Sequence, residues 1–356
     1  MIPTPPEETP PLIRRSVAAL EGYVPGEQPS GQTLIKLNTN ENPYPPPPKV
    51  QQALQAFAVD GLRRYPDPSC LALREKLASY HGASADQVLV GNGSDEVLAL
   101  CLRAFVEREG SVGYFDPSYS LYPVLAAIED VSTRPVALGP DFEWAMPAGY
   151  EASLFFLANP NAPTGLLFSK HDVRTFCEAF PGVVVIDEAY VDFAREDCVD
   201  LALSLPNVLV ARTLSKSFSL AGLRLGYAVG STALIAALHK IRDSYNVSAL
   251  SQALAEAALD DVGAVRENSG RIRATREKTA EDLGARGFSV TPSDANFLWV
   301  RPPDGGAKEL FAALRQENIL VRYFPGPRTG EHLRITIGTD GQMAQFVEAL
   351  DRIARA

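Results

Sequence analysis

The feature that most constrains this chain is a regular alternation of short apolar runs with longer amphipathic ones. The apolar runs predict strands at 87–90, 111–115, 154–157, 183–186 and 207–211, and helical spacing predicts helices at 94–106, 119–128 and 169–179. The run at 183–186 is wholly apolar, as a strand covered on both faces requires. The expected fold class is therefore α/β, with a central, mostly parallel sheet sandwiched by helices.

Different patterns flank this region. The proline-rich residues 1–35 predict an N-terminal arm with one short helix near 13–20. Residues 36–245 are expected to form the large domain. From about residue 233 the pattern is mainly helical as far as a glycine cap at Gly287. Short strands at 288–290, 297–300, 320–321 and 332–337 then alternate with helices at 306–316 and 341–354, so that 246–356 are expected to form a smaller α+β domain.

Composition excludes several classes of protein. The 356 residues carry a formal net charge of −10, which argues against nucleic-acid binding because phosphate contacts need a basic face. No apolar run approaches the roughly 18 residues of a membrane span. The start of the chain has no signal-peptide pattern, and the four cysteines form no CxxC pair, so we expect a cytoplasmic protein with reduced thiols. The four histidines are scattered, and no metal site is expected.

Four segments follow strands and carry chemistry. ARTLSKSFSLAGLRLGY places Lys216 between two serines and Arg224 eight residues later. VVVIDEAYVDF ends a buried strand in Asp187, with Tyr190 three residues on. LANPNAPTG (157–165) is a rigid turn with amide side chains, and VGNGSDE (90–96) leads from glycines into a helix. The carboxyl ends of parallel strands, where these segments lie, are where α/β sheets bind ligands.

Each segment also has a simpler interpretation. A lysine in a polar loop is usually a solvent-exposed side chain without a catalytic role. An acid at a strand end could belong to a Walker-B motif, although no P-loop is present. Gly91-x-Gly93 resembles the start of a Rossmann dinucleotide-binding unit, which would make the chain an NAD-dependent dehydrogenase. The third glycine of that fingerprint is replaced by Glu96, whose side chain would crowd a pyrophosphate.

Taken together, the four segments match the needs of pyridoxal 5'-phosphate (PLP). A lysine can form the Schiff base, and a carboxylate can keep the pyridine nitrogen protonated. An arginine, hydroxyls and a helix N-terminus can hold the phosphate. DPSYSLY (116–122) follows another strand and offers an aromatic ring to cover the pyridine.

From LEGYVPGEQP (20–29) to HLRITIG (332–338), the chain resembles the fold-type I PLP-dependent aminotransferases, and among them most closely the histidinol-phosphate aminotransferases. The resemblance implies that Lys216 holds PLP and moves the substrate proton, that Asp187 pairs with the pyridine nitrogen, and that Tyr190 bonds the ring oxygen O3′. The remaining cofactor contacts that it implies are Ser94, Asp95, Glu96, Tyr119, Asn161, Thr213, Ser215 and Arg224. Tyr65 matches a tyrosine that reaches the cofactor phosphate of the neighbouring subunit, which implies a homodimer.

The resemblance also implies substrate contacts. Arg334 matches the arginine that binds the substrate carboxylate, and its planar fork suits a phosphate equally well. Tyr23, Asn38 and Arg322 resemble further substrate contacts. The implied reaction takes histidinol phosphate and 2-oxoglutarate to imidazole acetol phosphate and glutamate, in histidine biosynthesis. An aromatic amino-acid aminotransferase and a threonine-phosphate decarboxylase remain alternatives.

One position departs from the family pattern. Where the family usually has N-P-N-N-P-T-G, this chain has Ala162 in place of the asparagine that bonds O3′. Either Asn161 substitutes for it or Tyr190 bonds O3′ alone. A lost hydrogen bond to a charged oxygen costs roughly 1.5–3 kcal/mol, so we expect slower but not abolished catalysis.

Overall fold

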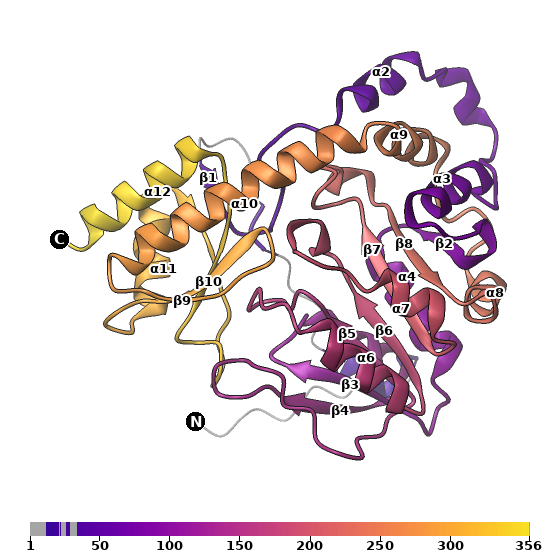
Figure 1. The fold of residues 1–356 in the computed structure, drawn as a ribbon, viewed down its shortest axis with the longest axis horizontal. Coiled ribbons are helices and arrows are strands. Elements are labelled where there is room, and N and C mark those ends of the chain that lie inside the picture. Colours follow the sequence, from indigo (N-terminus) through magenta and orange to yellow (C-terminus); the bar gives the residue numbers. More distant parts are fainter. Residues whose placement is uncertain (1–11, 21, 23–25, 29–33, 356) are drawn as a thin grey trace.

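The structure is a computed structural model that describes residues 12–20, 22, 26–28 and 34–355. A seven-stranded mixed sheet forms the centre of its larger part, in the order β2-β8-β7-β6-β5-β3-β4 (Figure 1). Its strands are β2 (Val88–Gly91), β3 (Ser111–Asp116), β4 (Ser132–Ala137), β5 (Leu154–Ala158), β6 (Val183–Asp187), β7 (Val208–Thr213) and β8 (Gly226–Gly230). Strands β3 to β7 are parallel, and β8 is antiparallel to both β7 and β2. The carboxyl ends of all strands except β8 therefore lie at one edge.

Helices cover both faces of this sheet. Phe155 and Leu157 of β5 face one core, which contains residues of α3, α6, α7 and α9, whereas Leu154 and Phe156 face the other, with residues of α4, α5 and α8. This alternation explains why the central strands β5 and β6 are almost wholly apolar. The helices are α2 (Pro48–Ala56), α3 (Leu71–His81), α4 (Ser94–Phe105), α5 (Leu121–Glu129), α6 (Lys170–Ala179), α7 (Val199–Ser204), α8 (Thr232–Ile241), α9 (Ala249–Leu259), α10 (Val262–Gly284) and the short α1 (Arg15–Ala18), with 3₁₀ turns at Val59–Arg63, Ala85–Gln87, Val191–Phe193 and Ala221–Leu223.

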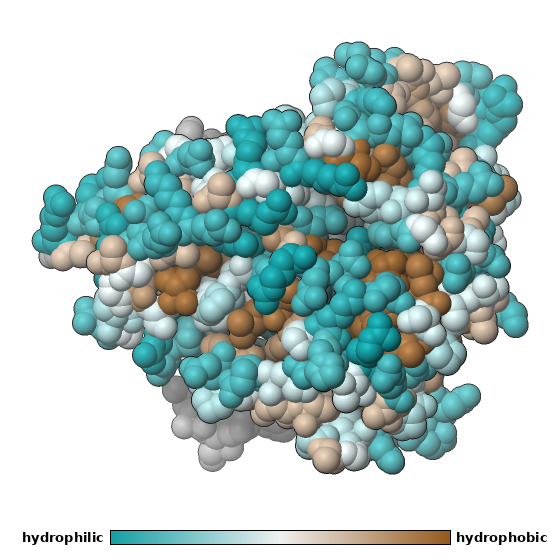
Figure 2. All heavy atoms as spheres, viewed as in Figure 1, coloured by the Kyte–Doolittle hydropathy of each residue, from teal (hydrophilic) through white to brown (hydrophobic). Residues whose placement is uncertain are grey.

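The smaller part is an antiparallel sheet in the order β12-β13-β10-β9, packed against helices. Its elements are β9 (Ser289–Thr291), β10 (Phe297–Arg301), β12 (Arg322–Tyr323), β13 (Leu333–Thr336), α11 (Ala307–Gln316) and α12 (Asp340–Ile353), and β1 (Ile35–Lys36) pairs in parallel with β11 (Ile319–Leu320). The long α10 joins the two parts, because Val265 packs in the core of the large sheet and Ile272 in that of the small unit. Its outer side is hydrophilic (Figure 2).

The expected elements are confirmed with end shifts of one or two residues. The cap at Gly287 is also confirmed, since its φ is +81° and the Phe288 N–H bonds the Leu283 carbonyl at 3.1 Å. Three strands were not predicted: β1 has only two residues, β4 contains arginine and proline and is largely exposed at the sheet edge, and β8 begins and ends in glycine. The single strand expected at 320–321 is divided between β11 and β12, and the helices α2, α3 and α7 were not predicted. The domain boundary expected after residue 245 stays a prediction; α9, beyond it, packs on α2 and α3 of the larger part.

Candidate active site

A cavity of about 780 Å³ lies at the carboxyl edge of the large sheet and is also lined by residues of the small unit. It brings together most of the residues predicted from the sequence, although they come from distant segments. The predicted residues that line it are Asn38, Ser94, Asp95, Tyr119, Asp187, Tyr190, Thr213, Ser215, Lys216, Arg224, Arg322 and Arg334.

Lys216 lies in the loop after β7, and its side chain enters this cavity. Its Nζ donates to the carbonyl of Thr39 at 3.2 Å and lies 5.8 Å from the centre of the Tyr190 ring. Burial lowers the pKa of Lys216 to about 8, and the neighbouring Arg334 and Arg224 act in the same direction. A substantial fraction of this amine is therefore neutral, and nucleophilic, at mildly alkaline pH.

Asp187 ends β6 and is 6% exposed. Its Oδ2 accepts a hydrogen bond from the hydroxyl of Tyr122 at 2.8 Å, and Oδ1 accepts from the Ala189 N–H at 3.2 Å. Burial raises the pKa of Asp187 to about 6, an effect that these two hydrogen bonds oppose. Asp187 is thus an ionised carboxylate near neutral pH that can pair with a protonated ring nitrogen.

Tyr122 is a site residue that the sequence reasoning missed. It is fully buried in α5, three residues after the predicted Tyr119, and burial raises its pKa well above the ordinary value. A tyrosine on the apolar face of a helix needs a partner for its hydroxyl, and that requirement was the available signal. Tyr119 meets the Tyr122 ring edge-on at 5.6 Å, and its hydroxyl donates to Asp95 at 3.3 Å.

A corner of the cavity that is suited to an anion lies where α4 begins. The predicted members are Ser94 and Asp95 in the first turn of α4, Thr213 and Ser215 after β7, and Arg224 before β8. The Thr213 and Ser215 hydroxyl oxygens are 2.9 Å apart, and an Arg224 Nη lies 3.5 Å from the Asp95 carboxylate. Within the described chain no side chain caps this helix N-terminus, so its backbone N–H groups are available to an anion.

Two glycines make this corner possible. Gly93 has φ +95°, and a Cβ there would lie 2.8 Å from an Arg224 nitrogen. A Cβ on Gly226 would overlap the backbone nitrogen of Ser94. Both positions therefore require a residue without a side chain if helix, strand and arginine are to meet around one small anion.

A second cationic group lies on the small unit. Arg322 and Arg334 are directly opposite each other on the antiparallel strands β12 and β13, and both line the cavity. Arg334 donates to the Asn38 carbonyl at 3.2 Å and lies over the rings of Phe297 and Phe324 at 5.3 and 5.2 Å. Like charges opposite each other on neighbouring strands are destabilising, and an anionic ligand between them would offset that cost. Tyr23, also expected here, lies outside the described residues.

The structure does not bring three predicted residues into the cavity lining. Glu96 accepts hydrogen bonds from the Asn92 N–H and from Asn246, so it closes the turn before α4. Asn161 donates to the Pro117 carbonyl at 3.3 Å and accepts from Thr164 at 2.8 Å, whereas Ala162 does line the cavity. Tyr65 is 80% exposed and stacks on Tyr245 at 4.4 Å.

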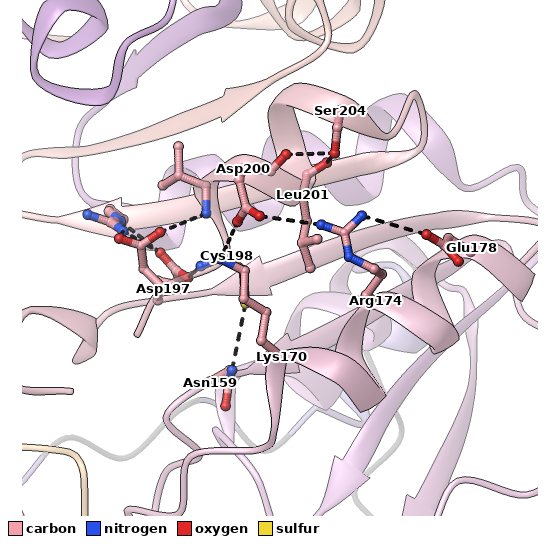
Figure 3. Close-up of polar contacts among 12 residues, drawn as sticks. Asn159, Lys170, Arg174, Glu178, Asp197, Cys198, Asp200, Leu201 and Ser204 are labelled. Atoms are coloured by element: carbon pink, nitrogen blue, oxygen red, sulfur yellow. Dashed lines mark hydrogen bonds and ion pairs between the residues drawn. The ribbon is translucent and has the colours of Figure 1, made fainter. Parts of the chain in front are cut away.

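The first amide of the same turn is also structural. Asn159 accepts from the Phe168 N–H at 2.8 Å, and its Nδ2 faces the Cys198 sulfur at 3.9 Å (Figure 3). Next to Cys198, the buried Glu188 accepts from its backbone N–H and pairs with Arg212 at 2.7 Å, while Asp197 lies 3.3 Å from Arg212. These contacts fix the backbone on either side of Asp187 and Thr213 from outside the cavity.

Other kinds of site find no support in the part of the chain that is described. Among those residues no group of three or more His, Cys, Asp or Glu side chains could hold a metal ion, and no helix is long and apolar enough to cross a membrane. The Rossmann alternative fails on topology: β2, which precedes Gly91-x-Gly93, is an edge strand antiparallel to its neighbour β8. A dinucleotide fingerprint needs a parallel βαβ unit at that point.

Comparison with known proteins agrees with this geometry. Residues 32–350 match the family model of aminotransferase class I and II. Histidinol-phosphate aminotransferase of Geobacter sp. (strain M21) is 44% identical over 95% of this chain and 97% of its own length, and that of Chromohalobacter salexigens is 46% identical over 96% and 98%.

The solved structures show the same fold. The crystal structure of histidinol-phosphate aminotransferase from Sinorhizobium meliloti, in complex with pyridoxal-5'-phosphate, superposes with a TM-score of 0.87 at 25% identity, covering 98% of this chain and 99% of that one. The expected fold of type I is thereby confirmed. A match over nearly the full length, together with a lysine, a carboxylate and an anion corner in one cavity, means that this chain belongs to the class I and II aminotransferases.

Proposed function

We propose that this protein is a PLP-dependent aminotransferase that converts histidinol phosphate and 2-oxoglutarate into imidazole acetol phosphate and glutamate, a step of histidine biosynthesis. The observation that carries the proposal is the single cavity in which Lys216 and Asp187 lie between two anion-binding groups of residues. The relatives that match almost the whole chain are named for the same reaction.

The residues present fit PLP group by group. Lys216 offers a partly neutral amine to the aldehyde, and Asp187 is a buried carboxylate whose described hydrogen-bond donors, Tyr122 and the Ala189 N–H, are both neutral. The open N-terminus of α4 with Arg224 suits the phosphate. When bound, PLP supplies an electron sink that makes the hydrogen on the substrate Cα acidic.

The chain's own residues then divide the work. Lys216 would take up the proton of the substrate Cα and return it, acting as base and as acid, because its amine lies in the cavity and has a pKa lowered to about 8. Asp187 keeps the ring nitrogen protonated. Tyr190 would donate to the ring oxygen O3′, since the Asn161 amide is already engaged with the Pro117 carbonyl and the Thr164 hydroxyl and the Ala162 side chain has no donor. Tyr119 would cover the ring.

Two substrates share one binding group. Histidinol phosphate carries a phosphate where glutamate carries its α-carboxylate, and the guanidinium of Arg334 can bind either anion. Arg322, opposite it, adds the second positive charge that a doubly charged phosphate favours. Asn38, and Tyr23 outside the described residues, complete the proposed substrate contacts.

We also propose that the protein works in the cytoplasm as a homodimer whose active sites are shared. Tyr65 is exposed on its own chain, together with Leu54, Val59 and Leu62 at 52, 75 and 54% exposure. A group of large exposed apolar side chains is typical of an interface. In the dimer, Tyr65 would reach the cofactor phosphate bound by the partner.

The test is an absorbance spectrum of the purified protein with PLP, recorded before and after histidinol phosphate is added. The expected result is a cofactor band that is lost on addition of histidinol phosphate and returns with 2-oxoglutarate. A band that responds to phenylalanine instead, or release of CO₂ from threonine phosphate, would replace the proposed donor. Absence of any band with Lys216 intact would contradict the PLP assignment.

A further inference from the structure

Asn40 occupies an unusual position beside the cavity. It is 1% exposed, and its φ of +56° lies in the left-handed region. That region is energetically unfavourable for residues other than glycine. Its backbone N–H donates to Thr336 Oγ1 at 3.0 Å, and its carbonyl accepts from Asn296 Nδ2 at 3.0 Å. A residue keeps such a conformation only where its surroundings hold it there. In Asn40 the conformation places the side-chain amide between Thr336 and Tyr190.

The hydrogen bonds of Asn40 orient its side-chain amide. Thr336 Oγ1 accepts from the Asn40 N–H and donates its own proton to Asn40 Oδ1, 3.0 Å away. The Asn40 amide is then fixed with its NH₂ group towards the Tyr190 hydroxyl, to which it donates at 2.9 Å. The Tyr190 oxygen is thus an acceptor on this side, and its single proton is left for another partner.

We propose that Asn40 is a positioning residue that turns the Tyr190 proton into the cavity, where Tyr190 donates it to the anionic ring oxygen of the cofactor. The inference rests on the proposed function, because it assigns the direction of a hydrogen bond to PLP. It also accounts for Ala162: with the family's usual donor missing, the O3′ bond depends on Tyr190 alone.

The segment around Asn40 supports this role. The Asn38 carbonyl accepts from Arg334 and the Thr39 carbonyl from Lys216, each at 3.2 Å. Asn42 Nδ2 donates to the carbonyls of Lys216 and Ser217 at 3.0 and 3.1 Å. Residues 38–42 therefore contact Arg334, Lys216 and Tyr190 and fix their positions relative to one another.

The test is the pH titration of the absorbance of the bound cofactor in the Asn40→Gly holoenzyme. Glycine accepts φ +56° without strain, so the substitution removes the side chain and keeps the backbone. A hydrogen bond donated to the ring oxygen stabilises the negative charge on that oxygen. It therefore favours the deprotonated form of the bound cofactor, in which the proton shared between that oxygen and the Lys216 nitrogen has been released. Losing one such hydrogen bond should raise the titration midpoint by about one pH unit.

The charged groups around the site stay the same in this variant. Tyr190 faces Arg334, Asp187 and Asp95, and Lys216 faces Arg334, Glu41, Asp95 and Arg224. Asparagine and glycine are both neutral, so a change in the midpoint does not come from a changed charge. Asn318→Gly is the matched control, because Asn318 has φ +60° but is exposed and outside the cavity. Its midpoint should equal that of the wild type.

A double-mutant cycle separates positioning from general support of the fold. In a Tyr190→Phe background, Asn40→Gly should leave the midpoint unchanged, because the proton it orients is gone. An equal shift in both backgrounds, or no shift in Asn40→Gly alone, would overturn the inference. If the wild type shows no cofactor band, the proposed function fails instead, so the two failures are distinguishable.

Discussion

At Lys216 the surroundings oppose a positive charge. Burial and two arginines lower its pKa to about 8, whereas Glu41 and Asp95 act in the opposite direction. A free lysine at its ordinary pKa near 10.5 would be almost entirely charged at neutral pH. The neutral amine is the nucleophile that captures an aldehyde, so the lowered pKa supports the role proposed for Lys216.

The rate at which the apoprotein binds PLP covalently should follow this ionisation. Because the pKa of Lys216 is lowered, the reactive form is present above about pH 8 and is lost as the pH falls below it. We expect the rate to drop about tenfold per pH unit below 8 and to level off above it. Glu41→Gln removes a charge that raises this pKa, so its rate profile should move to lower pH. A wild-type midpoint near 10.5 would contradict the assignment.

The hydroxyl of Tyr122 should set the acid limit of cofactor binding. Its hydrogen bond lowers the pKa of Asp187, which burial has raised to about 6. In Tyr122→Phe we expect that pKa to rise by about one unit, equivalent to a charged hydrogen bond of roughly 1.5 kcal/mol. Ionised Asp187 would then be lost as the pH falls through 7 rather than 6.

PLP affinity measured between pH 6 and 9 tests this expectation. The variant should bind PLP several-fold more weakly at pH 6–7 and equally well at pH 9, where Asp187 is ionised in both proteins. Tyr150→Phe is the control, since the Tyr150 hydroxyl donates to the Arg134 carbonyl away from the cavity. An affinity loss independent of pH would mean that Tyr122 only supports packing.

At the scale of elements, the site depends on how closely α4 meets β8. Gly226 opens β8 opposite Thr213, and a Cβ there would overlap the Ser94 backbone. We expect Gly226→Ala to displace the start of α4, to cost about 1–3 kcal/mol of stability and to weaken PLP binding at least tenfold. Thermal unfolding of the apoprotein and PLP titration would measure the two effects.

Gly270→Ala provides the contrast within a helix. A Cβ there meets only an Arg273 nitrogen at 3.8 Å, an ordinary contact in the long α10. Alanine should therefore stabilise the protein by roughly 0.5–1 kcal/mol and leave PLP binding unchanged. If Gly226→Ala behaved in the same way, the phosphate corner would not depend on close backbone approach.

The sequence predicted elements better than it predicted contacts. The parallel strands β3, β5, β6 and β7 were evident because each contains a mainly apolar run, and the candidate residues followed from their position after strand ends. β4 and β8 were not evident, because Pro135 and the terminal glycines of β8 conceal the strand pattern. The partners of Tyr122 and Asn40 could not be predicted, since each partner is distant in sequence and meets its residue only in the folded protein.

Asn161 shows that motif spacing can also suggest a contact that the folded chain does not make. Its position one residue before Ala162 made it a candidate for the missing donor, yet its amide bonds the Pro117 carbonyl and the Thr164 hydroxyl. A shift of one residue along a tight turn redirects a side chain, and motif spacing alone does not reveal where it points. The position of Asn161 therefore supports the proposal that Tyr190 bonds O3′.

At the scale of the whole molecule, the cavity belongs to both parts of the chain. The large sheet contributes Asp187 and Lys216, the small unit contributes Arg322 and Arg334, and residues 38–40 line the space between them. The residues proposed for chemistry and those proposed for substrate binding are thus on different parts of the chain, which α10 joins. Tyr65 is the one predicted cofactor contact that is described but points to solvent, stacked on Tyr245.

If the active site is shared between the two subunits of a dimer, hybrid dimers of two impaired variants should regain activity. Lys216→Ala should be inactive, and Tyr65→Ala should be strongly impaired if Tyr65 completes the partner's site. When the two variants are unfolded together at equal concentration and refolded, half of the dimers should be hybrids, and each hybrid regains one site with both Lys216 and the opposing Tyr65. About a quarter of the wild-type activity per site should return.

Variants refolded separately and then assayed together without exchange serve as the control. Activity no higher than in that control would mean that each chain completes its own site and that the role proposed for Tyr65 is wrong.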